Sequence, residues 1–170
     1  RYYGLTDYNA NQLSYYGNLL FDSYLFNDHH TYSVGVSYTY DKYDEHLDDS
    51  TFQRVEQVPG AFVEYDFNDD HHWNIIAGFR ADYNTYYKKM LYTPRLHVRF
   101  KTHDDFALRL SAGKGYRSPN VLAENSTMLA SSRVIRFLDT PKMEDAWNYG
   151  INLTKDFHIG WRELILQADF

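Results

Sequence analysis

Residues 73–83 read Trp-Asn-Ile-Ile-Ala-Gly-Phe-Arg-Ala-Asp-Tyr, and this stretch decides the fold class. Its odd positions are apolar or aromatic, whereas its even positions include Asn74, Arg80 and Asp82. This period of two is typical of a β-strand with one apolar and one polar face, not of a helix. The same alternation predicts seven further strands, at 13–26, 32–40, 61–67, 96–100, 106–112, 147–157 and 164–170.

The expected connections between these strands differ in length. Short turns are predicted at 27–30, 68–72, 102–105 and 158–161. They alternate with longer links at about 41–54, 87–92 and 116–143, so all the short turns lie at one end of the sheet. Transmembrane β-barrels have this arrangement of loops, whereas a soluble sandwich need not have it. The sequence therefore favours an all-β, antiparallel transmembrane β-barrel.

Strand length and aromatic placement agree with a membrane barrel. Ten residue steps separate Trp73 from Tyr83, and ten separate Trp147 from Phe157. At about 3.3 Å per residue such a strand is roughly 33 Å long, and a tilt of about 45° reduces its height to roughly 23 Å. That height is close to the apolar band of such barrels, about 25 Å. Aromatic residues at both ends predict two interfacial girdles.

Composition excludes several classes of protein. An aromatic content of 18% argues against disorder, and a net charge of −6 argues against a nucleic-acid partner. The chain has no Cys, so disulfides and thiolate metal sites are excluded. Asp and His clusters such as residues 69–72 are interpreted as turn chemistry instead of metal ligands. No Gly-x-Ser-x-Gly motif is present, and we expect no catalytic residue, no metal and no cofactor.

The polar faces of the predicted strands carry charges of both signs. Such charges are costly to bury in a soluble core but are normal in the wet lumen of a barrel. We predict that the following residues line a lumen wall: Arg80, Asp82, Arg95, Arg99, Arg109 and Glu144. An eight-stranded barrel has almost no interior space, so these charges favour about eight strands of a wider barrel.

Residues 110–120 read Leu-Ser-Ala-Gly-Lys-Gly-Tyr-Arg-Ser-Pro-Asn. They resemble the Gly-x-Gly-Phe/Tyr-Arg-x-Pro signature of TonB-dependent outer-membrane receptors. Residues 92–96 resemble the Pro-Arg-Leu strand of that family, and residues 144–150 resemble its Glu-x-x-x-Asn-Tyr/Phe-x-Gly strand. Residues 121–133 look like the Bacteroidetes branch. The order and spacing of these motifs match over about 61–170.

The resemblance implies a 22-stranded barrel whose lumen is occluded by an N-terminal plug. It also implies active uptake of a nutrient ligand in the outer membrane of a Gram-negative cell, and no enzyme activity. Residues 1–170 would be a partial barrel domain without the plug. The implied partners are outer-membrane lipid, the protein's own plug and remaining strands, the TonB complex, and a siderophore, haem, cobalamin, glycan or peptide ligand. The alternative is a small self-contained barrel that serves as an adhesin, an anchor or a rim enzyme.

The link at 116–143 is the best candidate for contact with a ligand or plug, because a link of this length is rarely a mere connector. Its mixture of polar and apolar residues predicts a loop folded over the lumen mouth or the plug. The polar candidates in it are Arg117, Asn120, Glu124, Asn125 and Arg133. We also predict that Arg117 lies on the inner wall and pairs with an acid of the next strand, Glu144.

Overall fold

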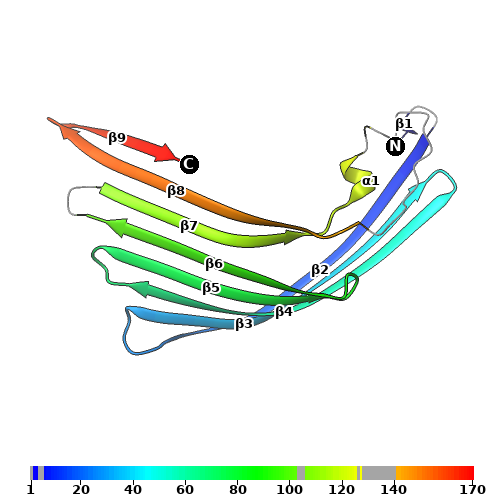
Figure 1. The fold of residues 1–170 in the computed structure, drawn as a ribbon, viewed down its shortest axis with the longest axis horizontal. Coiled ribbons are helices and arrows are strands. Elements are labelled where there is room, and N and C mark those ends of the chain that lie inside the picture. The colour runs from blue at the N-terminus through cyan, green and yellow to red at the C-terminus, as the bar shows by residue number, and fades with distance from the viewer. Residues whose placement is uncertain (1, 4–5, 103–105, 126, 128–140) are drawn as a thin grey trace.

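The computed structural model describes residues 2–3, 6–102, 106–125, 127 and 141–170. One antiparallel sheet runs through them in the order of the sequence, from β1 to β9 (Figure 1). Its strands are β1 (Tyr2–Tyr3), β2 (Thr6–Tyr24), β3 (His30–Leu47), β4 (Ser50–Asn68), β5 (Trp73–Asn84), β6 (Lys89–Lys101), β7 (Phe106–Arg117), β8 (Glu144–Ile159) and β9 (Arg162–Asp169). The prediction of an all-β antiparallel sheet with eight long strands is confirmed, and the two-residue β1 adds a ninth strand.

The sheet is curved and open. Figure 1 shows the short helix α1 (Val121–Glu124) on the concave side of the sheet. In the described part of the chain, β1 and β9 lie at opposite edges and do not pair with each other. The described residues therefore form a curved wall, not a closed eight-stranded barrel. Among them, no helix is long and apolar enough to cross a bilayer.

The strand registers divide the side chains between two faces. Directly opposed residues of an antiparallel pair share a face. Val63 opposes Phe79 across β4 and β5, whereas the next pair, Glu64 and Gly78, points the other way. We call the first face the apolar face and the second the polar face. The residues predicted to line a lumen all lie on the polar face: Arg80, Asp82, Arg95, Arg99, Arg109 and Glu144.

The apolar face is uncovered over most of its width. Leu19 is 73% exposed, Val36 is 55% exposed and Phe79 is 47% exposed. In the part of the chain that the structure describes, the buried apolar side chains are few: Tyr8, Leu91, Ala107 and Leu122. A soluble two-layer protein buries such a face against a second layer, and the described residues provide none. A continuous exposed apolar surface of this kind marks contact with another protein or with lipid.

The prediction of a long loop at 41–54 is wrong. β3 continues to Leu47 and β4 begins at Ser50, so the connection is only Asp48–Asp49, and Asp48 has a positive φ of 48°. The alternation fails there because both faces are polar: Lys42 and Asp44 point to the apolar side, where they form an ion pair at 3.0 Å. The strands continue by pairing with each other even though the hydrophobic pattern has ended.

The two ends of the sheet differ less in loop length than the sequence predicted, because the expected long link at 41–54 is a two-residue turn. One end of the sheet, here the short-turn end, carries the links 25–29, 69–72, 102–105 and 160–161. The opposite end, here the long-loop end, carries the two-residue turn at 48–49, the four residues 85–88 and the long link 118–143. Extension of β3 and β4 shortens the first of these links, so one long connection distinguishes the two ends.

Candidate functional site

The candidate site lies on the polar face at the long-loop end, where the chain leaving β7 turns back across the sheet. Residues 118–120 contact β4 and the turn after β5, and α1 reaches β3 and β2. The described residues 118–125 of this link therefore lie over the polar face, and their contact with a ligand or plug stays a prediction. Two sets of contacts hold it there, one polar and one apolar.

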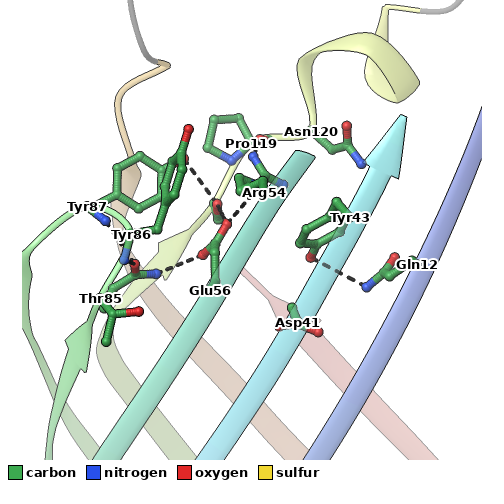
Figure 2. Close-up of polar contacts among 12 residues, drawn as sticks. Gln12, Asp41, Tyr43, Arg54, Glu56, Thr85, Tyr86, Tyr87, Pro119 and Asn120 are labelled. Atoms are coloured by element: carbon green, nitrogen blue, oxygen red, sulfur yellow. Dashed lines mark hydrogen bonds and ion pairs between the residues drawn. The ribbon is translucent and has the colours of Figure 1, made fainter. Parts of the chain in front are cut away.

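The polar contacts centre on Glu56 of β4, which is only 3% exposed (Figure 2). Its carboxylate accepts a hydrogen bond from Ser118 Oγ at 2.6 Å and one from Asn84 Nδ2 at 2.8 Å. Arg54 Nε lies 3.1 Å from Oε1 of the same carboxylate. A buried carboxylate is tolerated only when it is paired and hydrogen-bonded in this way. Glu56 therefore joins β4, β5 and the loop at one point.

Arg54 extends this network to the loop backbone and to two aromatic rings. Its Nη1 donates to the carbonyl oxygen of Pro119 at 2.9 Å. Its guanidinium carbon lies 4.3 Å from the ring centre of Tyr43 and 6.0 Å from that of Tyr86, within the range of cation–π attraction.

Asn84, which is 2% exposed, connects the same network to the turn between β5 and β6. Its Oδ1 accepts hydrogen bonds from the backbone N–H groups of Tyr86 and Tyr87, while its Nδ2 donates to Glu56. The Tyr87 hydroxyl lies 3.1 Å from Ser118 Oγ. Turn 85–88 and the loop are thus held by shared partners.

The apolar contacts are made by α1. Leu122 is 4% exposed and packs against Tyr8 of β2, with Leu47 and Phe52 beside it. The side chains of these three partners point to the polar face. They lie at the long-loop end of the sheet, beyond the charged residues Arg80 and Asp82. This small apolar cluster packs α1 against the long-loop ends of β2, β3 and β4.

Arg117 lies at the end of β7 directly opposite Glu144 of β8. Its Nε donates to Glu144 Oε2 at 2.9 Å, and its Nη2 lies 3.1 Å from Glu124 Oε2. The predicted pairing of Arg117 with Glu144 is confirmed, and Glu124 is a second acid that the sequence did not connect with Arg117. Glu124 Oε1 also accepts the backbone N–H of Asn120, so this trio sets the path of the chain from β7 into α1.

Between this loop and the short-turn end, the polar face carries ion pairs whose side chains pack against glycines of the neighbouring strand. Arg80 Nε donates to Asp82 Oδ2 at 2.7 Å, and Arg80 Nη2 donates to Ser37 Oγ at 2.7 Å. A Cβ at Gly60 would lie 1.8 Å from Asp82 Oδ1, so the glycine makes room for the carboxylate. The Glu56 network and Asp82 border a hollow of about 400 Å³, which is within the size range of small-ligand sites.

The other predicted loop residues differ in their positions. Asn120 precedes α1 and lies beside the network, and Asn125 donates through its side chain to the carbonyl oxygen of Val121. Arg133 lies outside the residues that the structure describes. Sequence reasoning missed Arg54, Glu56 and Asn84. Continuing the alternation from Phe62 and Glu64 toward the N-terminus would have placed Arg54 and Glu56 on the polar face.

Within the described ranges, no group of three or more His, Cys, Asp or Glu residues is placed to hold a metal ion. The turn at 69–72 instead shows ordinary turn chemistry, because Asp69 Oδ1 accepts the backbone N–H groups of His71, His72 and Trp73. The arrangement on the polar face can bind and orient a ligand, and it offers no paired nucleophile and base.

Comparison with known protein families decides the identity of this wall. The family described as "TonB dependent receptor-like, beta-barrel" matches residues 1–164. The chain belongs to this family. TonB-dependent receptors are outer-membrane β-barrels of Gram-negative bacteria that act with a plug domain, TonB and small-molecule ligands. They are transport receptors and not enzymes, in agreement with the prediction of no catalysis.

Solved structures of two receptors share the fold of this TonB-dependent receptor chain. The siderophore receptor PirA from Pseudomonas aeruginosa matches with a TM-score of 0.63 and 12% identity, over 94% of this chain and 32% of that receptor. PirA from Acinetobacter baumannii matches with a TM-score of 0.61 and 12% identity, over 94% of this chain and 26% of that receptor. The chain thus spans about a third of the first receptor. A comparison with curated proteins gave no match.

Proposed function

We propose that residues 1–170 form part of the barrel wall of an outer-membrane receptor that takes up a nutrient ligand with energy delivered by TonB. The observation that carries this proposal is the division of the sheet into an exposed apolar face and a charged polar face. In a membrane barrel the apolar face contacts lipid and the polar face lines the lumen. The membership of the family supports the same assignment.

The two ends of the sheet suggest an orientation in the membrane. Barrels of this kind have short turns on the periplasmic side and longer loops outside the cell. The short-turn end would therefore face the periplasm, and the loop held by Glu56 would face the exterior. In this orientation the hollow of about 400 Å³ beside Glu56 and Asp82 lies where an incoming ligand first meets the wall.

The finer assignments are also part of the proposal. The receptor would close its barrel with further strands and fill it with its own plug, through which the TonB complex acts. A siderophore is one candidate ligand because two receptors of this fold are described as siderophore receptors. Haem, cobalamin, glycan and peptide ligands stay in the proposal on equal terms. The resemblance of residues 121–133 to the Bacteroidetes branch is kept as a proposal about origin.

Cysteine labelling tests the assignment of the two faces. Ser111→Cys and Thr93→Cys place a thiol on the polar face, and the matched variants Leu110→Cys and Leu96→Cys place one on the apolar face of the same strands. In outer membranes, a charged water-soluble maleimide is expected to label only the first pair, and detergent extraction should expose the second. Equal labelling of all four thiols in membranes would refute the lipid-facing assignment and, with it, the receptor wall.

A further inference from the structure

The polar face of β6 and β7 has an unusual distribution of charge. Both strands are described throughout, and their registers place six Lys or Arg residues on this face, with no Asp or Glu: Lys89, Arg95, Arg99, Lys101, Arg109 and Arg117. The whole chain carries a net charge of −6, so this stripe runs against the overall composition. Segregation of one sign of charge creates a local positive potential that attracts anions.

Two of these six cations, Arg95 and Arg117, have acidic partners. Both lie nearer the long-loop end of their strands than Arg99 and Arg109 do. Arg95 Nη2 lies 2.5 Å from Glu64 Oε2, and Arg117 contacts Glu144 and Glu124. Arg99 and Arg109 differ from them because they oppose each other directly across β6 and β7. Within the described part of the chain, neither arginine forms an ion pair. Like charges in directly opposed positions destabilise a sheet.

The surroundings of this pair are suited to a ligand. Arg109 is oriented by neutral groups, because its Nη1 donates to Asn152 Oδ1 at 2.8 Å and to Thr154 Oγ1 at 3.3 Å. The pair borders a hollow of about 530 Å³ that also includes His97, Ser111 and Asn74, which can donate hydrogen bonds. The hollow has one carboxylate in its lining, Asp169, which accepts a hydrogen bond from Asn152 Nδ2. This volume is typical of small-molecule sites. The hollow lies toward the short-turn end, well apart from the Glu56 network.

We propose that Arg99 and Arg109 form a binding site for a small molecule that carries an oxyanion group, a carboxylate or a phosphate. An oxyanion between the two guanidinium groups accepts charged hydrogen bonds from both and removes their mutual repulsion. The enclosure of a lumen lowers the effective dielectric constant and strengthens both effects. The inference rests on the proposed function, in that the polar face must line the lumen of the barrel and not contact lipid.

Calorimetric titration of the complete purified receptor with citrate, and separately with inorganic phosphate, tests the site at low ionic strength. We expect salt-sensitive binding, and we expect Arg99→Gln and Arg109→Gln each to weaken it roughly tenfold, the effect of one charged hydrogen bond. Arg95→Gln is the matched control, because it removes one charge from the same strand and face outside the hollow. This variant should change the affinity less than about threefold. Citrate binding alone identifies a carboxylate site, and phosphate binding alone identifies a phosphate site.

Three results would overturn the inference. One is the absence of binding of both probes at millimolar concentration. Another is an equal loss of affinity in Arg95→Gln, which would reduce the site to general attraction by positive charge. The last is that neither probe binds and that the Arg99→Gln and Arg109→Gln variants are less thermally stable than the wild type. This result would mean that a carboxylate of the receptor itself pairs with the two arginines. Maleimide labelling of Arg99→Cys separates these results from failure of the proposed function. A thiol that is labelled only after detergent extraction faces lipid and removes the lumen. With any other labelling pattern, the absence of anion binding removes only this site.

Discussion

At the scale of single residues, Glu56 has the largest predicted contribution to the loop. Replacing it by Ala leaves the side chain of Arg54, which is only 14% exposed, without its carboxylate. It also leaves Asn84 Nδ2 and Ser118 Oγ without the carboxylate that accepts their hydrogen bonds. Loss of one partner of a buried ion pair costs about 3 kcal/mol. We expect Glu56→Ala to lower the free energy of unfolding by that amount and to expose residues 118–125 to protease. Urea unfolding and limited proteolysis of the complete receptor measure the two effects.

Glu64→Ala is the control for this prediction. Glu64 lies on the same strand and the same face as Glu56, and it also forms an ion pair with an arginine. Its pair is largely open to solvent, with the Arg95 side chain 55% exposed. Exposed pairs contribute about 1 kcal/mol or less. A loss at Glu64 as large as that at Glu56, or an unchanged cleavage pattern in Glu56→Ala, would contradict the role given to the buried network.

Gly60 is a second residue at which a small change has a defined consequence. A Cβ at this position would lie 1.8 Å from Asp82 Oδ1, so Gly60→Ala must displace Asp82 from Arg80. We expect a loss of about 2 kcal/mol in unfolding free energy, in the range found for overpacked sites. Gly115→Ala is the matched change on the same face, because nothing lies within 4 Å of its added Cβ. Equal unfolding midpoints for the two variants would disprove the close packing of Asp82 on Gly60.

At the scale of elements, the turn from β4 to β5 is expected to depend on pH. Backbone hydrogen bonds from Trp73, and then from His72 and His71, hold the pKa of Asp69 below its ordinary value. A carboxyl whose folded pKa is lowered stabilises the fold fully above its unfolded pKa, and this stabilisation disappears as the pH falls through the folded pKa. The turn should therefore loosen below about pH 4.

Amide hydrogen exchange of His71, His72 and Trp73 measures this loosening. In the wild type, protection of these amides from exchange relative to the unstructured chain should fall as the pH drops from about 5 to 3. In Asp69→Asn, protection should be low throughout and should change little with pH, because the charged acceptor is absent. Protection that is equal in the two proteins at pH 6 would refute the role of the carboxylate.

The strands themselves were predictable wherever one face is apolar. At 73–83 and 147–157 the period of two identified both the strand and its two faces, and the structure has β5 and β8 there. The pattern ended at about residue 40, yet β3 continues to Leu47 because its backbone pairs with β2 and β4. Pairing partners far apart in sequence are not visible in local alternation. Arg54 and Glu56 lie in the same segment, where the apolar alternation is absent, and the buried network was missed for that reason.

The contacts of Arg117 show a different limit. Its pairing with Glu144 followed from adjacent strands, since the end of one strand and the start of the next meet in an antiparallel hairpin. Its contact with Glu124 depends on how the chain turns into α1, and that path is set by the docking of Leu122 on β2. Contacts decided by the meeting of distant elements require the structure, whereas contacts decided by register can be predicted.

At the scale of the whole molecule, the sheet places two of its three tryptophans at the ends of the apolar face. Trp73 opposes Phe100 at the short-turn end of β5, and Trp147 opposes Lys114 near the long-loop end of β8. Trp161 lies in the turn between β8 and β9 and is 95% exposed. Between these ends the face is largely aliphatic, with Leu96 and Ile151 among its exposed residues. Indole rings prefer the depth of the lipid headgroups, so two girdles should result.

Fluorescence quenching by brominated lipids measures the depth of each ring. The experiment uses the complete receptor reconstituted in lipid, with any tryptophans outside residues 1–170 replaced by Phe. In each variant, two of the three tryptophans Trp73, Trp147 and Trp161 are also replaced, so that a single indole ring fluoresces. Trp73 and Trp147 should be quenched most by bromines placed high on the acyl chain, near the headgroup, and least by bromines near the chain end. Trp161 should show the weakest quenching, because its turn extends beyond the aliphatic band. Strongest quenching of Trp73 or Trp147 by bromines near the chain end would place that ring at the bilayer centre, and the apolar face could then not be the lipid-facing wall described above.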